Sequence, residues 1–259
     1  MIHAIHAGAL HVRLAEGSAD IRAAQALRHR VFYEERGALP FAGKPDGLDS
    51  DPYDAACDHL LVVERDGGAE RIVGTYRLLR QEVAEQHDGF YSASEYDLSP
   101  LLASSGEQAG QLLELGRSCV AADHRNASTI ALLWRGIASY LEAHRIRAMF
   151  GCASFLGTDP NVHAQALSYL AHHHSAPGEL SIRALPQHHV EMARLPIGAY
   201  EPRAAARSLP PLIKGYLRVG AQIGDGAFID RQFSTVDVFV LMPVEAIAAR
   251  YSERFRKAA

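Results

Sequence analysis

The chain has 259 residues, of which 48% are hydrophobic, and its formal net charge is -4. This length and apolar content suffice for a sizeable core in one large domain or two small ones, and the net charge excludes a protein whose whole surface attracts nucleic acid. The three cysteines form no Cys-x-x-Cys pair, which argues against a disulfide framework, and neither a signal peptide nor an apolar run of about 18 residues occurs, so a cytoplasmic protein is expected.

In the first half of the chain, strands are expected at three runs: 11–15, 59–64 and 71–79. A helix is expected over residues 18–35, with Ser18 as its N-cap. The segment Asp66-Gly67-Gly68 predicts that the second and third strands form a hairpin. Residues 41–58 contain glycine, proline and five aspartates, which predicts a loop of the kind that carries binding groups.

Residues 81–110 are polar and rich in turn formers, which indicates an insertion between strands. Further strands are expected at 111–121, 147–154 and 228–242, the last as one strand or two. Helices are expected at 126–144, where Asn126, Ser128 or Thr129 is the N-cap, at 161–173 and at 244–257. Residues 174–211 predict no clear element. Because strands and helices alternate, the pattern favours one mixed α/β domain.

The strand expected at 111–121 carries Glu114 and Arg117 on either side of Gly116. In a regular strand these two charged side chains point to opposite faces, since side chains alternate. A glycine inside a strand often marks a bulge, and one extra residue turns both side chains toward the same side. This stretch alone fits a functional site on a bulged strand and an exposed edge strand with two solvated charges equally well, and the rest of the chain must decide between them.

Other chemistries find little support in the sequence. It has no Gly-x-Ser-x-Gly, no His-x-x-x-x-Asp of the glycerolipid acyltransferases and no His-Glu-x-x-His. Cys119 and Cys152 are candidate nucleophiles, but free cysteines are mostly buried and inert. The histidine runs at 172–174 and 188–189 suggest a metal site, yet consecutive residues on a helix point in different directions. No metal is expected.

Four segments follow one another in the order and spacing of a known group of enzymes: 27–35, 51–63, 72–79 and 114–117. They resemble the autoinducer-synthase-like branch of the GNAT N-acyltransferases. Further segments resemble the L-ornithine N-alpha-acyltransferases of bacterial ornithine-lipid synthesis, often called hemolysin-like proteins, and not the acyl-homoserine-lactone synthases: 151–155, 157–160, 209–218, 220–221 and 224–227. The resemblance extends from about residue 10 to residue 245.

The resemblance implies a GNAT-like α/β fold, in which helices flank a mixed central sheet with a bulged and splayed central strand. It implies a single domain over residues 1–259, with a family-specific part from about residue 175. The implied reaction is transfer of a (3-hydroxy)fatty acyl group to the α-amine of an amino acid, above all L-ornithine, which gives a lyso-ornithine lipid. Glu114 and Arg117 match the catalytic positions, and the matching Glu of the family is the proposed base. The matching substrate-binding positions are Arg28, Phe32, Asp51, Asp54 and Arg77.

The charges of these positions also suggest an arrangement. Two arginines from a helix and a strand, facing two aspartates from a loop, make a network that satisfies itself. Such a network is either a scaffold or also recognises the acceptor, whose α-carboxylate an arginine can bind.

The acyl donor is expected to contact Val120, Arg125, Ser128 and Ser154. Acetyl-CoA users carry a glycine-rich loop that binds the pyrophosphate, whereas residues 125–130 contain no glycine. This favours acyl-phosphopantetheine on acyl carrier protein as co-substrate, with no bound cofactor. Carrier proteins are acidic, so a local basic surface is expected to dock them; the candidates are Arg145 and Arg147, or the C-terminal set Arg250, Arg254, Arg256 and Lys257.

Two alternatives stay open. One is acylation of another amine, such as glycine, lysine or a homoserine-lactone precursor. The other is a module without catalysis that binds acyl carrier protein or a lipid surface. Peripheral contact with the inner membrane surface is an additional expectation, and no nucleic acid is expected as a partner.

Overall fold

The computed structural model describes residues 4–40, 47–104 and 110–247. The chain divides into two compact units. Unit 1 comprises Met1–Phe90 with Leu113–Ile146, and unit 2 comprises Tyr91–Leu112 with Arg147–Ala259. The single domain expected from the sequence stays a prediction.

Unit 1 is built on five strands, which lie in the order β1, β2, β3, β4 and β6. Their bounds are β1 (Ile5–Ala7), β2 (Leu10–Leu14), β3 (Asp58–Asp66), β4 (Ala69–Arg80) and β6 (Gln111–Val120). All neighbours among these strands are antiparallel. The predicted hairpin is confirmed between β3 and β4, where Gly67 and Gly68 have φ values of +55° and +90°. Positive φ at both turn residues suits the twist of the flanking strands, and glycine adopts it without strain.

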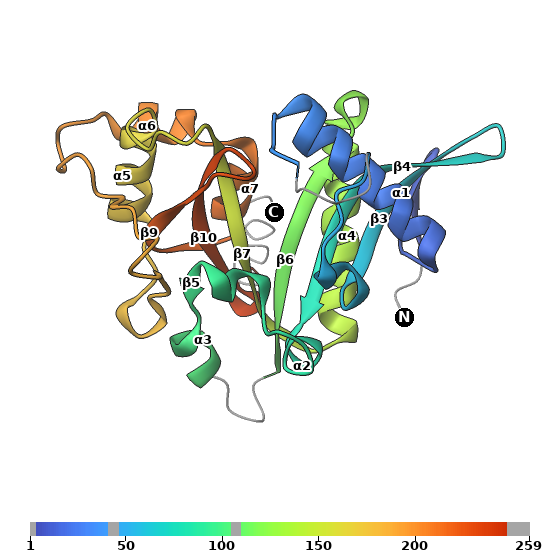
Figure 1. Ribbon diagram of the computed structural model, residues 1–259, viewed down its shortest axis with the longest axis horizontal. Helices are drawn as coiled ribbons and strands as arrows, with labels where there is room; N and C mark the ends of the chain where they lie inside the picture. The colour runs from blue at the N-terminus through green and yellow to red at the C-terminus, as the bar shows by residue number, and fades with distance from the viewer. Residues whose placement is uncertain (1–3, 41–46, 105–109, 248–259) are drawn as a thin grey trace, which may run out of the picture. The chain divides into compact units, whose positions relative to one another are not determined.

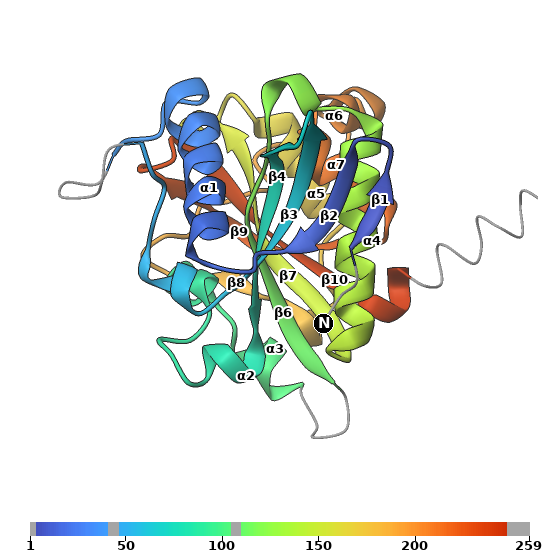
Figure 2. The ribbon, with the colours of Figure 1, turned by 90° about the vertical axis from the view of Figure 1, so that its right-hand side faces the viewer.

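Two helices cover the opposite faces of this sheet, α1 (Ser18–His29) and α4 (Ala127–Ala143), as Figure 2 shows. On one face Ala24 of α1 packs with Leu61 and Val63 of β3. On the other, α4 comes so near that a Cβ on Gly136 would lie 2.8 Å from Val12 and 2.9 Å from Leu60. The strands between are buried on both faces, which explains their nearly continuous apolar sequence.

The ends of these helices differ in part from the sequence expectation. Ser18 is not the N-cap: Gly17 takes that position, and no side chain caps the helix. The helix expected to reach residue 35 changes at Arg30 into a π-helical segment, η1 (Arg30–Glu35), which carries Phe32. The Asn126 cap of α4 is confirmed, because its side chain accepts a hydrogen bond from the Thr129 N–H at 3.1 Å.

Three short helical segments complete the described part of unit 1. They are η2 (Pro52–Ala55), α2 (Gln81–Ala84) and η4 (Ala122–His124). The loop expected over residues 41–58 thus contains one helical turn near its end, and its residues 41–46 lie outside the described part of the chain.

Unit 2 has the strands β7, β10, β9, β8 and β5 in that order. Labels in Figure 1 mark β5, β7, β9 and β10. Their bounds are β5 (Tyr96–Asp97), β7 (Ile146–Leu156), β8 (Arg183–Ala184), β9 (Gln222–Asp230) and β10 (Thr235–Pro243). Its helices are η3 (Tyr91–Ser94), α3 (Ser99–Ala103), α5 (Ala164–His173), η5 (Gly178–Leu180), α6 (Pro202–Ser208) and α7 (Pro211–Arg218). Strands β8 and β9 are parallel, whereas the pairs β7–β10, β9–β10 and β5–β8 are antiparallel.

The expected mixed α/β fold with flanking helices is confirmed. The strand at 228–242 is in fact two strands, of which β9 begins six residues earlier than expected. Glycines hid that start: a Cβ on Gly224 would lie 2.6 Å from the Ile182 carbonyl oxygen, so the close approach of the neighbouring chain requires glycine there. The C-terminal helix expected at 244–257 falls mostly outside the described residues. The sequence also predicts a splay beside the central strand. It concerns β6 and β7, which belong mostly to different units, and it stays a prediction.

Within the described ranges, no helix is long and apolar enough to cross a membrane. The three cysteines, all described, form no disulfide.

Candidate functional site

The predicted bulge in β6 is confirmed by the register of its pairing with β4. Arg77 lies opposite Gly116 and Thr75 lies opposite Cys119, so two steps along β4 match three along β6. The left-handed residue is Arg117, with φ of +50°, and not the glycine before it. A non-glycine residue in this region costs about 1–2 kcal/mol, so the contacts of its side chain must hold it there.

The bulge brings Glu114 and Arg117 to the same face of the sheet. Glu114 lies opposite Leu79 on β4, and Gly116 lies opposite Arg77, which in turn lies opposite His59 on β3. Opposite residues in a ladder share a face, and so do residues two apart on a strand. Glu114 therefore shares its face with Arg77, and Arg117 reaches that face too, because it binds an aspartate that Arg77 also binds. Glu114 is 4% exposed.

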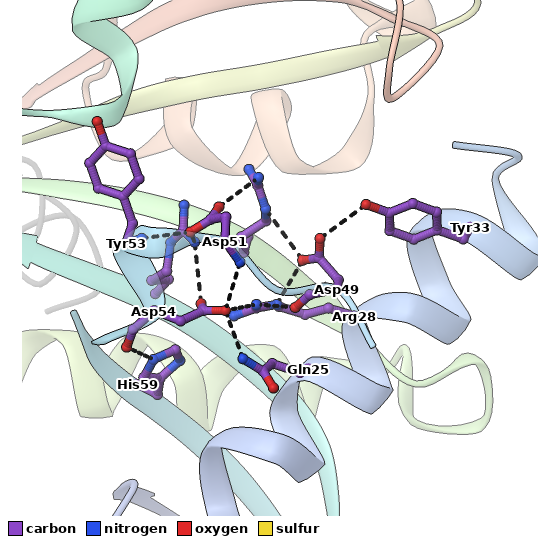
Figure 3. Close-up of polar contacts among 10 residues, drawn as sticks. Gln25, Arg28, Tyr33, Asp49, Asp51, Tyr53, Asp54 and His59 are labelled. Carbon is purple, nitrogen blue, oxygen red and sulfur yellow. Dashed lines mark hydrogen bonds and ion pairs between the residues drawn. The ribbon is translucent and has the colours of Figure 1, made fainter. Parts of the chain in front are cut away.

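Six charged side chains of unit 1 form a closed ring of ion pairs, which we call the Arg–Asp ring: Arg28, Asp54, Arg77, Asp51, Arg117 and Asp49. Arg28 and the three aspartates are labelled in Figure 3. Arg28 binds Asp49 and Asp54, each with a nitrogen–oxygen distance of 2.8 Å. Arg77 binds Asp51 at 2.6 Å and Asp54 at 3.2 Å. Arg117 closes the ring through Asp51 at 3.1 Å and Asp49 at 3.3 Å. Three positive charges are thus balanced by three negative ones.

The aspartates are held by the turn on which they lie. The Asp51 side chain accepts the Tyr53 N–H at 2.9 Å, and the Asp54 side chain accepts the Asp51 N–H at 3.3 Å, so each caps the start of η2. The His59 Nε2 lies 3.0 Å from the Asp54 carbonyl oxygen, which ties the end of η2 to β3. Local hydrogen bonds within this turn thus orient the carboxylates of Asp51 and Asp54.

Burial makes these ion pairs mutually dependent. Burial raises the pKa of Asp54, but the hydrogen bond and charge of Arg28 and the amide of Gln25 outweigh it and hold that pKa well below its usual range. At Asp51, burial likewise opposes the charges of Arg77 and Arg117, which leave its pKa lowered. A buried charge that loses its partner costs several kcal/mol, so removal of one member weakens the whole ring.

Four residues of this cluster were not predicted from the sequence: Gln25, Tyr33, Asp49 and His59. Gln25 binds Asp54 at 2.8 Å and Tyr33 binds Asp49 at 3.2 Å. The signal for Asp49 was present, because it is one of five aspartates in the 41–58 loop. Gln25 and His59 are buried on a helix and a strand, and Tyr33 is half-buried on η1, where sequence alone indicates only core or surface.

The remaining expected residues lie in different places. Phe32 is half-buried on η1, and its carbonyl accepts the Ala38 N–H at 2.9 Å. At the end of β6, the Val120 carbonyl accepts a hydrogen bond from Arg125 Nε at 3.1 Å, and Arg125 also pairs with Glu35. Ser128 is exposed in the first turn of α4. Ser154 belongs to unit 2, where it lies opposite Asp237 in the β7–β10 pair.

Arg145 and Arg147, the two described candidates for docking acyl carrier protein, differ in their exposure. Arg145 is exposed with φ of +52°. Arg147 is half-buried and donates to the Leu101 carbonyl at 3.1 Å, and burial lowers its pKa. The C-terminal candidates Arg250, Arg254, Arg256 and Lys257 lie outside the described residues.

Cys57 and Cys119 are thiols rather than thiolates. Burial raises the pKa of Cys57 to about 12, against the opposing charge of Arg77 and with the help of Glu114. Burial also raises the pKa of Cys119 to about 12. Neither can supply a thiolate nucleophile at neutral pH.

The histidine runs do not converge on a common point. His172 Nδ1 lies 2.9 Å from the Tyr200 hydroxyl, and His174 Nε2 lies 3.3 Å from the Tyr169 hydroxyl. In the described part of the chain, no group of three or more His, Cys, Asp or Glu residues could hold a metal ion.

Known proteins resemble this chain along most of its length. A family model for the acetyltransferase (GNAT) domain matches residues 27–135. The L-ornithine N(alpha)-acyltransferase of Agrobacterium fabrum is 48% identical over 248 residues, which cover 94% of this chain and 84% of that protein. The enzyme of the same name from Rhizobium meliloti is 49% identical over 247 residues, which cover 93% of this chain and 82% of that protein.

A solved structure supports the fold. FeeM, an N-acyl amino acid synthase from uncultured soil microbes, has a TM-score of 0.52 at 12% identity, over 93% of this chain and 94% of that one. At this identity the likeness concerns the fold alone. With relatives at 48% and 49% identity over almost the whole sequence, the family expected from the motifs is confirmed, and the chain belongs to the L-ornithine N(alpha)-acyltransferase family of GNAT acyltransferases.

Proposed function

We propose that the protein transfers a 3-hydroxy fatty acyl group from acyl carrier protein to the α-amine of L-ornithine, which gives a lyso-ornithine lipid. The observation that carries the proposal is the buried carboxylate of Glu114 on a bulged strand, beside a charge-balanced ring, in a chain of this family. The relatives' names provide the acceptor, and the site provides the base.

Acyl transfer from a thioester to an amine requires a free amine, an aligned carbonyl carbon and a donor for the developing oxyanion. Glu114 takes the proton from the amine, directly or through a water molecule. The amine nitrogen then bonds to the carbonyl carbon, the carbon–sulfur bond breaks, and the thiolate of phosphopantetheine leaves and takes up the proton. The backbone at Arg117 and Ser118, where the bulge interrupts the ladder, is our candidate for the oxyanion donor.

The Arg–Asp ring acts mainly as a scaffold in this proposal. The sequence leaves two roles open for the ring, a scaffold or a binding site for the acceptor's α-carboxylate. Binding that carboxylate would need an arginine whose charge is not already neutralised by the protein. Each arginine of the ring already contacts two aspartates. The ring instead holds Arg117 in its left-handed conformation and thereby keeps Glu114 and the bulge in place.

Acyl carrier protein is proposed as the donor because the region before α4 lacks a pyrophosphate loop. Residues 125–130 contain no glycine, the Asn126 side chain already accepts the Thr129 N–H, and Arg125 is engaged by Val120 and Glu35. A donor without a nucleotide needs none of these groups. A cytoplasmic location, with peripheral contact at the inner membrane, agrees with three cysteines outside any disulfide and with an amphiphilic product.

The test is acylation in vitro with 3-hydroxyacyl-acyl carrier protein and a panel of amines: ornithine, lysine, glycine and putrescine. We expect N-alpha-acylornithine as the main product by mass spectrometry. If another amine is preferred, that amine replaces ornithine as the proposed acceptor. If no amine is acylated, the alternative of a non-catalytic binding module describes the protein better.

A further inference from the structure

Gly116 leaves room for a further atom on the face that carries Glu114. Among the described residues, a Cβ placed on Gly116 would have one neighbour within 4 Å, Arg77 Nε at 3.8 Å. Gly74, on the opposite face of the same sheet, contrasts with it, since a Cβ there would lie 3.4 Å from Val62 and 3.6 Å from Thr129. Gly116 is half-buried, and its φ is not positive, so the backbone does not require glycine.

The position of this space relative to Glu114 suggests its use. Residues two apart on a strand are separated by about 6.6 Å and point to the same face. In the proposed reaction, Glu114 holds the α-amine of the amino-acid acceptor. The α-carbon and α-carboxylate of that acceptor then lie either beside Gly116, two residues along the strand, or beside Leu79, which is opposite Glu114 on β4. Leu79 has a large side chain that is 3% exposed, so the room lies on the Gly116 side.

Charge alone gives little selectivity at this place, because the neighbouring Arg–Asp ring is balanced. The room available beside Glu114 is therefore the property by which the site can select one amine over another. We infer that Gly116 is a specificity-determining residue, whose missing side chain admits the α-carbon and α-carboxylate of an amino-acid acceptor beside Glu114. This inference rests on the proposed function and adds to it the residue that makes room for the acceptor.

The test compares Gly116→Ala with the wild type in steady-state kinetics. One added methyl group beside the acceptor should raise the KM for ornithine about 10- to 100-fold. The KM for the acyl donor should change less than about twofold, and the thermal midpoint should not fall, because alanine orders a strand at lower entropic cost than glycine. Hydroxylamine has no α-carbon, so its enzyme-dependent acylation, measured after subtraction of the uncatalysed reaction of hydroxylamine with the thioester, should be equal in both proteins.

Gly74→Ala is the matched control, since it makes the same substitution in the neighbouring strand on the face that packs against α4. Its KM for ornithine should equal that of the wild type. An unchanged KM for ornithine in Gly116→Ala would overturn the inference, as would an equal rise for ornithine and hydroxylamine. A wild type that does not acylate ornithine would refute the proposed function, and with it this inference, before any variant is compared.

Discussion

Glu114 is the side chain on which the proposed chemistry depends most. It is 4% exposed, and it shares a face with Arg77 and Gly116. Its charge also contributes to the raised pKa of Cys57, which places its carboxylate near the thiol and the Arg–Asp ring. A carboxylate in these surroundings is able to accept a proton from an amine that approaches over the sheet.

We expect Glu114→Gln to keep the fold and to lower kcat by about two to four orders of magnitude, because the amide has the same shape but cannot accept the proton. Glu142→Gln, at an exposed position of α4, is the control and should retain full activity. Acyl-transfer assays and thermal unfolding measure the two effects. Turnover near that of the wild type in Glu114→Gln would rule out the catalytic assignment.

The thiols at Cys57 and Cys119 should be inert in the folded protein. With both pKa values raised to about 12, the thiolate fraction at pH 7 is negligible. After iodoacetamide treatment at pH 7, mass spectrometry should find both residues unmodified, and acyl transfer should persist. Labelling after denaturation is the control. Rapid labelling of either residue with loss of acyl transfer would point instead to a thiol nucleophile.

At the scale of elements, the Arg–Asp ring connects segments that are distant in the chain. It joins α1 through Arg28, the segment around η2 through three aspartates, β4 through Arg77 and β6 through Arg117. The alternation of charges lets each carboxylate stabilise two guanidinium groups, so the contribution of one residue extends over four elements. The ring is thus a structural support for the bulge.

Asp54→Asn should destabilise the protein by about 3–5 kcal/mol, because the ring would then hold three positive charges against two negative ones, and Arg28, which is 1% exposed, would lose one of its two carboxylate partners. The lowered pKa values of Asp51 and Asp54 also predict a pH dependence. A carboxyl group with a lowered pKa contributes stability that is complete above its unfolded pKa near 3.9 and is lost as the pH falls toward the lowered value.

Urea unfolding between pH 7 and pH 3 measures both effects. The wild type should lose stability below about pH 4, and Asp54→Asn should lose less, since one of the titrating groups is absent. Glu70→Gln, in an exposed pair with Arg65, serves as the control and should have little effect at any of these pH values. Equal slopes for the wild type and Asp54→Asn would contradict the assigned role of Asp54.

At the scale of the whole molecule, net charge and donor choice are connected. The chain carries a formal net charge of -4, and carrier proteins are acidic, so docking requires a local basic surface. Arg145 remains exposed for this purpose, whereas Arg147 is engaged by the Leu101 carbonyl. Contact between exposed charges is screened within about 10 Å at 0.1 M salt.

We therefore expect acyl carrier protein to be a far better donor than coenzyme A with the same acyl chain, and its KM to rise with salt. The reasons are the missing glycine loop in residues 125–130 and the proposed docking of an acidic carrier protein on exposed basic residues. Initial rates with both donors at two salt concentrations test this. The coenzyme A reaction is the internal control, because its KM should depend less on salt; equal efficiency with both donors would contradict the prediction.

The sequence by itself determined the features that depend on near neighbours or on a fixed pattern. The glycine pair at 67–68 fixed the hairpin, Asn126 fixed the start of α4, and the Glu-x-x-Arg spacing around Gly116 indicated the bulge. Motif order gave the family and five members of the ring that lie in matching positions, Arg28, Asp51, Asp54, Arg77 and Arg117. These signals lie within a few residues or in a shared order, so no tertiary contact was needed to find them.

Only the tertiary structure decided which groups complete the site. Asp49 closes the ring through Arg117, Gln25 and His59 support Asp54, and these partners are 5 to 68 residues apart in the chain. Such pairs follow from strand register and from the packing of α1, which a local pattern does not encode. The left-handed turn also falls on Arg117 and not on the glycine, because contacts formed across the fold outweigh the local preference of the residue.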